Sequence, residues 1–337
     1  MAACGYRTGK IHDPARSNWQ NSGDRPIAWS AWYPIEGQED AERAVGHFFD
    51  LGHVIRNADL AGKARLPVVL LSHGTGGTAE SLGWLARVLA CKGHVVIGAN
   101  HHGNTGLEPY DAAGFLCWWE RAADLSLLLT SLGTTGFFAN RFDEKNVSAI
   151  GFSLGAHTVL ALGGARTSLM TFDAWRRANT IADSGPAEFP DVADHIPVLE
   201  KTSEAFRLSW ARQGEDFSDS RIGTLVAIAP APPIRSLTPQ AIAALKLPVT
   251  VLTGGADLEA PSAQCAEWLM RQNKSFQRYD LGQNVGHYTF LSPPSDKSLV
   301  GKIDVFSDHK DVDRKQVHRA VADIVLAAIG GSTYRAR

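Results

Sequence analysis

The sequence predicts an α/β fold with a mostly parallel sheet, and three observations lead to that prediction. Five apolar runs have the length and composition of buried strands, and segments with helical periodicity separate most of them. The 337 residues contain no internal repeat or low-complexity tract. Strands that alternate with helices are typical of domains in which helices cover a parallel sheet.

The predicted strands show two patterns. Alternating apolar and polar residues in RPIAWSAWYPI, residues 25–35, indicate an early antiparallel strand. Nearly continuous runs of Val, Ile and Leu are expected where both faces of a parallel sheet are covered. Five such runs follow in order: LPVVLLSHG (66–74), HVVIGANHHG (94–103), NVSAIGFS (146–153), GTLVAIAPAP (223–232) and LPVTVLTGGAD (247–257).

Three helices are predicted from apolar residues that recur every three or four positions, because that spacing places them on one helical face. Leu82, Leu85 and Leu89 form the first such face. Residues 118–132 contain the second and residues 317–328 the third.

Residues 166–221 interrupt the alternation of strands and helices. This stretch is charged, has a helix-like pattern and contains no convincing strand. Four aromatic residues are spaced along it: Trp175, Phe189, Phe206 and Trp210. We therefore expect a helical lid inserted into one core domain. The core domain comprises residues 1–165 and 222–337.

Composition and charge narrow the class of protein. Hydrophobic residues make up 44% and charged residues 20%, as in ordinary globular proteins. The formal net charge is −2 and basic residues are scattered, so nucleic acid and anionic membranes are not expected as partners. No apolar run approaches the ~20 residues that span a bilayer. The start, MAACGYR, lacks the apolar stretch of a signal peptide, which predicts a cytoplasmic protein unless an exported one has lost its leader.

The four cysteines are Cys4, Cys91, Cys117 and Cys265, and they lie too far apart for the spacing of a zinc site. No metal is therefore expected. Cys91 and Cys117 fall in apolar helical stretches, where buried free thiols are the usual state. Disulfide pairing stays open.

One serine lies in a sharp turn from strand to helix in NVSAIGFSLGAHTVL, residues 146–160. Ser153 ends a predicted parallel strand, where ligands of open α/β sheets collect. Gly151 and Gly155 remove side chains that would clash with the adjoining strand and helix, which is the pattern of a nucleophile elbow. A serine that merely caps the next helix is the structural alternative.

An acyl-transferring serine needs a base and a carboxylate that orients the base. His287 in NVGHYTFL follows the last predicted strand in a glycine-flanked loop, and histidine suits proton transfer because imidazoles titrate near neutrality. Asp257 and Glu259 in GGADLEAP are both candidate acids. Asp257 is preferred because it is closer to the strand end and its shorter side chain has less rotamer freedom.

The backbone N–H groups of Thr75 and Leu154 are the expected donors to the oxyanion of a tetrahedral intermediate. Thr75 lies in LLSHGTGGT, a glycine-rich loop after a core strand, and Leu154 follows the serine. A turn without a chemical role is the alternative for this loop. Neither SHGTGGT nor LTGGAD matches a nucleotide-binding pattern, so no cofactor is expected.

Other histidines and tryptophans near these motifs have less certain assignments. His73 is expected to orient the glycine-rich loop, and His157 to pack against or cap its helix. Four further side chains either line the pocket or belong to the core: His101, His102, Trp118 and Trp119.

These motifs resemble the α/β-hydrolase superfamily, in the branch of the dienelactone hydrolases and platelet-activating-factor acetylhydrolases. The matches run over most of the chain: GYRTGKIHDPAR, AWYP, LSHGTGG, GFSLG, SRIGTLVAIAPAP, GADLEAP, GHYTFL and FSDHKDVDRKQVHRAV. The resemblance implies that Ser153, Asp257 and His287 form a catalytic triad. The sequence departs from both namesakes, since acetylhydrolases place the acid after an earlier strand and dienelactone hydrolases use a cysteine nucleophile.

The sequence thus predicts a serine esterase that hydrolyses a small-molecule carboxylic ester without cofactor or metal. Lactones, thioesters and amides stay open as substrates, because the same residues serve them. A non-catalytic binding protein with this fold is the alternative from another class. Loss of a triad residue would favour that alternative, and here all three are present. The oligomeric state stays open.

Overall fold

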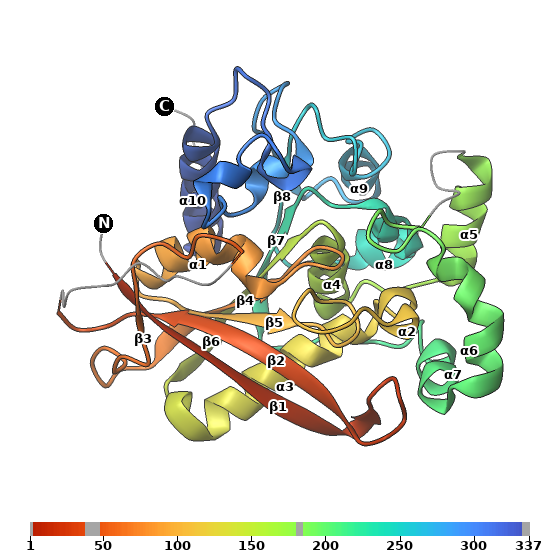
Figure 1. The fold of residues 1–337 in the computed structure, drawn as a ribbon, viewed down its shortest axis with the longest axis horizontal. Coiled ribbons are helices and arrows are strands. Elements are labelled where there is room, and N and C mark those ends of the chain that lie inside the picture. Colours follow the sequence, from red (N-terminus) through yellow and green to blue (C-terminus); the bar gives the residue numbers. More distant parts are fainter. Residues whose placement is uncertain (1–2, 38–47, 180–184, 332–337) are drawn as a thin grey trace.

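The computed structural model describes residues 3–37, 48–179 and 185–331, and these form a nine-stranded sheet with helices on both faces (Figure 1). The strand order along the sheet is β3-β1-β2-β5-β4-β6-β7-β8-β9. This confirms the predicted α/β fold. The strands are β1 Cys4–Ser17, β2 Asp24–Tyr33, β3 Val54–Arg56, β4 Leu66–Ser72, β5 Val95–Asn100, β6 Phe142–Phe152, β7 Ile222–Ile228, β8 Val249–Thr253 and β9 Gln277–Asp280.

The sheet is antiparallel at β2 and parallel from β5 to β9. β2 pairs antiparallel with β1 and β5, and the other neighbours between β5 and β9 pair parallel. Ser72 of β4 lies opposite Gly151 of β6, which in turn lies opposite Ala227 of β7. Because these strands end in register, the loops that follow them meet at one edge of the sheet.

Three strands were not predicted: β1 and β9, because their sequences are polar, and β3, because it has only three residues. Beyond the short pairing of β3 with Cys4–Tyr6, β1 has one unpaired edge, and most of its side chains there are exposed or half-buried. β9 is the last strand of the sheet and has no fully buried residue. Strands at a sheet edge face water on one side and therefore lack the apolar runs of central strands.

Helices bury two separate apolar layers against the sheet. α1 and α10 contribute Leu85 and Val321 to one layer. α3, α4, α8 and α9 contribute residues such as Leu125 and Val159 to the other. The helices are α1 Gly83–Ala90, α2 Ala112–Leu116, α3 Glu120–Thr134, α4 Leu154–Leu162, α5 Leu169–Ala178, α6 Ile196–Thr202, α7 Glu204–Ala211, α8 Pro239–Ala244, α9 Ala266–Gln272 and α10 Arg314–Ile329.

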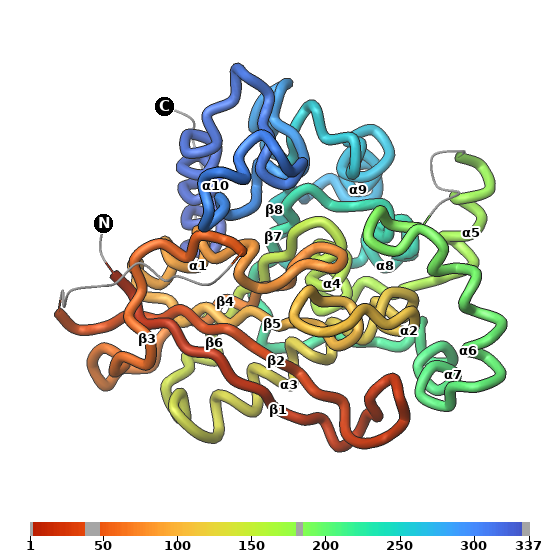
Figure 2. Tube along the Cα trace, in the orientation of Figure 1, coloured from red at the N-terminus to blue at the C-terminus, as the bar shows by residue number. Residues whose placement is uncertain are grey.

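Within the described part of residues 166–221 the chain forms α5, α6 and α7 and no strand. The trace in Figure 2 shows this segment at one side of the molecule, next to α2. A third apolar cluster joins the segment to the core, and it includes Phe115, Trp119 and Phe206. The segment is thus packed against the region that follows β5.

The cysteines differ from the expectation in one respect. Cys4, Cys117 and Cys265 are buried, whereas Cys91 is exposed, and none of the four forms a disulfide. The apolar run around Cys91 suggested burial, but α1 ends at Ala90 and the chain turns there toward β5.

Candidate active site

Ser153 occupies a strained turn between β6 and α4. Its backbone has φ 56° and ψ −118°, a conformation that L-residues rarely adopt. A Cβ atom on Gly151 would lie 1.9 Å from the carbonyl oxygen of Gly155, and one on Gly155 would lie 2.0 Å from the carbonyl oxygen of Ser72. Only glycine fits at either position, so the sequence pattern and the turn geometry agree.

The loops after β6, β8 and β9 bring three predicted residues together. The Nε2 atom of His287 lies 3.0 Å from Ser153 Oγ, and its Nδ1 atom lies 2.8 Å from Asp257 Oδ2. Since a carboxylate only accepts hydrogen bonds, Nδ1 carries the proton and Nε2 is left to accept from the serine hydroxyl. All three side chains are buried.

Of the two candidate acids, only Asp257 contacts His287. The second oxygen of Asp257 accepts a hydrogen bond from the backbone N–H of Ala260 at 2.7 Å, which holds the carboxylate in place. Glu259 is exposed and lines the cavity instead. The glycines before Asp257 permit this approach, because a Cβ on Gly254 would lie 2.2 Å from the carbonyl oxygen of Val285, just before His287.

The two predicted oxyanion donors lie on either side of the serine turn. Leu154 is the first residue of α4, where a backbone N–H has no partner within the helix. Thr75 lies in the glycine-rich loop after β4, next to Gly74. A Cβ on Gly74 would lie 3.1 Å from Ser153 Cβ, so this loop runs directly against the serine. Both amides are therefore near Ser153.

A buried network of charged and polar groups supports the glycine-rich loop. The Nε2 atom of His73 accepts from the backbone N–H of His101 at 3.2 Å, so its Nδ1 donates to the carbonyl oxygen of Gly74 at 2.6 Å. Burial, followed by the charge of Arg121, holds the pKa of His73 well below its usual value. Arg121 in α3 donates to the carbonyl oxygen of His73. His73 is therefore a neutral support for the loop.

His101 and His102 do not line the cavity. His101 bridges Asp124 and Ser72 at 3.0 Å each, and burial lowers its pKa to about 3. His102 pairs with Glu108 at 2.7 Å. Both are structural, which the sequence had left open.

His157, Trp118 and Trp119 have different positions in the structure. His157 is fully buried in α4, where its Nε2 lies 3.1 Å from Thr167 Oγ1, and burial lowers its pKa to about 3. Trp118 lines the cavity. Trp119 is fully buried and its indole N–H donates to the carbonyl oxygen of Ser209 at 3.0 Å.

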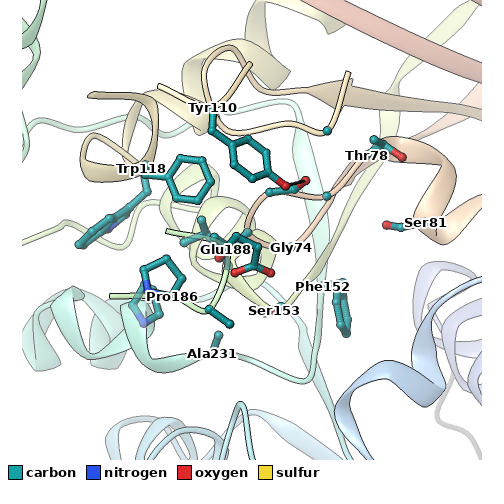
Figure 3. A pocket seen from close by; sticks show the side chains of 18 of the residues that line it. Gly74, Thr78, Ser81, Tyr110, Trp118, Phe152, Ser153, Pro186, Glu188 and Ala231 are labelled. Carbon is teal, nitrogen blue, oxygen red and sulfur yellow. Dashed lines mark hydrogen bonds between the residues drawn. The ribbon is translucent and has the colours of Figure 1, made fainter. Parts of the chain in front are cut away.

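Ser153 and His287 open into a cavity of about 1310 Å³ (Figure 3). The glycine-rich loop, the segment Ala231–Pro233 after β7, Tyr110 and residues within 166–221 supply its walls. Phe172, Trp175 and Trp210 of the insertion line it, whereas Phe206 is fully buried and does not. Sequence reasoning missed Tyr110 and Glu188, because neither belongs to a recognisable motif.

Two general features of the described residues complete the site. No group of three or more His, Cys, Asp and Glu side chains is arranged there to hold a metal ion. None of the helices in these same ranges has the length and apolar character needed to cross a membrane.

Comparison with known proteins relates this geometry to a family. The model of the alpha/beta hydrolase family matches residues 68–297, more than half of the chain. The solved structure of a ferulic acid esterase from Streptomyces cinnamoneus has a similar fold, with a TM-score of 0.66 and 18% sequence identity, over 98% of this chain and 90% of that chain. No curated protein matches the sequence. From the family match, we conclude that the chain belongs to the alpha/beta hydrolase family.

Proposed function

We propose that this protein is a serine esterase, in which Ser153, His287 and Asp257 form the catalytic triad. The observation that carries the proposal is the hydrogen-bond chain from the serine hydroxyl through the imidazole to the carboxylate, at 3.0 and 2.8 Å. Membership of a hydrolase family supports a hydrolytic reaction. The strained backbone of Ser153 supports a nucleophile, because strain of this kind concentrates at active sites.

In the proposed reaction Ser153 Oγ attacks the ester carbonyl carbon while His287 Nε2 takes the hydroxyl proton. The C–O bond to the alcohol then breaks, and the imidazolium returns the proton to the leaving alcohol oxygen. Water repeats the sequence on the acyl-serine and releases the carboxylic acid. Asp257 holds the imidazole tautomer and stabilises the imidazolium formed in each half-reaction.

The oxyanion formed in each step is assigned to the backbone N–H groups of Thr75 and Leu154. Fixed donors of this kind stabilise charge that develops only in the transition state. Their place beside Ser153, one in a loop supported by His73 and one at a helix N-terminus, supports the assignment.

Residues 166–221 are proposed to act as a lid that selects substrates. Phe172, Trp175 and Trp210 line the cavity from this segment, so the size and shape of the acyl or alcohol group would be tested against them. A closer relation to the dienelactone hydrolase and acetylhydrolase branch is likewise a proposal, supported by motifs such as GFSLG and GHYTFL.

A fluorophosphonate probe tests the proposal directly. One label per chain is expected, on the peptide that contains Ser153, and Ser153→Ala should remove it and lower kcat by about a millionfold. Ser81→Ala, at a buried serine that lines the same cavity, should still be labelled. Labelling that survives Ser153→Ala would refute the assignment of the nucleophile.

A substrate panel defines the reaction class. Purified protein should hydrolyse p-nitrophenyl esters, and lactones, thioesters, amides and a ferulate ester belong in the same panel. The ferulate ester is included because of the solved structure with the similar fold. A protein that hydrolyses amides but no ester would contradict the proposal of an esterase.

A further inference from the structure

Two glutamates that have no role in the proposed reaction lie beside the proposed catalytic residues. Glu188 comes from the insertion and Glu259 from the loop after β8, and both line the cavity with Ser153 and His287. Both residues keep accessible surface, while the Glu188 carboxyl is enclosed enough by the cavity walls for burial to raise its pKa. Neither forms an ion pair with a lysine or arginine in the part of the chain that the structure describes.

Glu188 lies close to the glycine-rich loop. A Cβ on Gly76 would lie 3.0 Å from Glu188 Cγ and 2.6 Å from the Tyr110 hydroxyl, which donates to the carbonyl oxygen of Gly76 at 3.0 Å. Figure 3 shows the Glu188 carboxylate pointing toward the middle of the cavity. Glu188 therefore reaches the space that a substrate bound at Ser153 would occupy.

The two glutamates act on each other electrostatically. Burial raises the pKa of Glu188, and the charge of Glu259 raises it further, while His287 opposes the rise. The pKa of Tyr288 is raised by burial and then by Glu259 and Glu188. Burial is the largest cause of the shift in the Glu188 pKa, and the charges of Glu259 and His287 are smaller causes. The cationic residues that line the cavity come from other elements, β1, β3 and α5: Lys10, Arg56 and Arg176.

Glu80 is a third glutamate in the cavity wall, and one of its carboxylate oxygens has no hydrogen-bond donor in the described part of the chain. Its side chain is only 6% exposed and its Oε1 accepts from Tyr6 at 2.8 Å and Ser30 at 2.5 Å. Its Oε2 is buried and has no hydrogen-bond partner among the described residues. A buried carboxylate oxygen without a donor is costly, and this one lies within the wall of the cavity.

We infer that the cavity accepts esters that carry a protonated amine, whose N–H groups donate to Glu188 and Glu259, and that it disfavours esters that carry a carboxylate. This inference rests on the proposed esterase function and adds the substrate class. A protonated amine offers both the charge and the donors that these acceptors lack, and neighbouring rings such as Tyr110 and Trp118 favour a cation as well.

Esters matched in shape and different in charge test the inference. On the acyl side, the p-nitrophenyl esters are 6-aminohexanoate, heptanoate and the monoester of pimelate. On the alcohol side, 2-(dimethylamino)ethyl butyrate is compared with 3-methylbutyl butyrate by titration of released acid. In at least one series the amine should have a kcat/KM about tenfold above its neutral isostere, and the pimelate ester should be about tenfold below heptanoate.

Variants identify the responsible carboxylates. Glu188→Gln and Glu259→Gln should each reduce the amine-to-neutral ratio of kcat/KM, and the double variant should bring it close to one. Glu144→Gln removes an exposed carboxylate at the opposite end of β6 from Ser153 and should keep the wild-type ratio. The inference is overturned if wild type shows no charge preference in either series, or if the preference survives in the double variant.

Binding separates this inference from the proposed function. In the Ser153→Ala variant, calorimetry should show hexylamine binding about tenfold tighter than hexanol, with hexanoate weaker still. If wild type hydrolyses no ester but this order of affinities holds and is lost in the double glutamine variant, the esterase proposal fails and the acidic binding site stands. Equal affinities of the amine and the alcohol would defeat the binding site itself.

Discussion

The two sides of the cavity are built in different ways. On the core side, Ser153, Asp257 and His287 follow strand ends or lie in short loops held by glycine close contacts, and their side chains are buried. On the insertion side, rings and Glu188 come from short helices and a turn that pack through a small apolar cluster. Under the proposed function, the core side sets the chemistry, which needs sub-ångström placement, and the proposed lid selects substrates, which tolerates variation.

The largest expected effect of a substitution on the core side is at Asp257, the proposed triad acid. Asp257→Asn should keep the fold and lower kcat on the order of ten-thousandfold, because the amide favours the wrong tautomer of His287. Glu259→Gln should lower it by less than about tenfold, since Glu259 does not contact the imidazole. Steady-state kinetics on one neutral ester compares the two. If Glu259→Gln inactivates the enzyme while Asp257→Asn does not, the acid is wrongly assigned.

Within the insertion, the residues that stabilise the fold should differ from those that select substrates. Phe206 is fully buried against Trp210, with ring centroids 4.9 Å apart, so Phe206→Ala should cost about 3–5 kcal/mol of unfolding free energy. Leu208 is 63% exposed on the same helix, and its substitution by Ala should change stability little. Urea unfolding measures both. Equal losses for the two variants would mean that α7 is not anchored through Phe206.

The core and the insertion should also differ in their response to acid. Burial lowers the pKa of His73, His101 and His157, all in the core, so each stays neutral when folded and gains a proton when unfolded. Their stabilising contribution is complete above the unfolded value near 6.5 and is lost as pH falls toward the folded values. Glu188 has a raised pKa, so the folded protein gains one proton there before the unfolded protein does. This proton partly offsets the loss of stability caused by the histidines.

The unfolding free energy should therefore fall between pH 6 and pH 4.5, by about 4 kcal/mol per pH unit from these three histidines. The slope should be steeper still, because burial also lowers the pKa of His94 and His318. Urea melts at several pH values give this slope. His195 in the insertion is 43% exposed, and His195→Gln should leave the slope unchanged. A flat profile over this window would show that the three core histidines bind protons in the folded state.

The smallest effect is expected at the rings that line the cavity. Phe172→Ala, Trp175→Ala and Trp210→Ala should each change the preference between short and long acyl chains by several-fold to about tenfold, because each alters the shape of a wall. Met170→Ala, at a position 81% exposed on the same helix as Trp175, should not. The measurement is kcat/KM across a p-nitrophenyl ester series. Unchanged preference in all three would remove the support for a selective lid.

Some of this protein was determined by the sequence alone, because the relevant geometry is local. The elbow at Ser153 needs small residues two positions away on either side, and Gly151 and Gly155 are neighbours in the chain as well as in space. The central strands were predicted for a similar reason, since burial on both faces demands continuous apolar runs. The polar strands β1 and β9 could not be predicted in this way, because part of their surface faces water and needs no apolar residues.

Other features depended on which distant segments pack together. Asp257 contacts His287, whereas Glu259, two residues away, does not. Asp257 can do so because the loop before His287 lies against the glycines that follow β8. The adjacent Trp118 and Trp119 likewise face the cavity and the core. Glu188 carries no motif and reaches the cavity only through the packing of the insertion. Side-chain direction at such positions follows from long-range packing, which local sequence patterns do not encode.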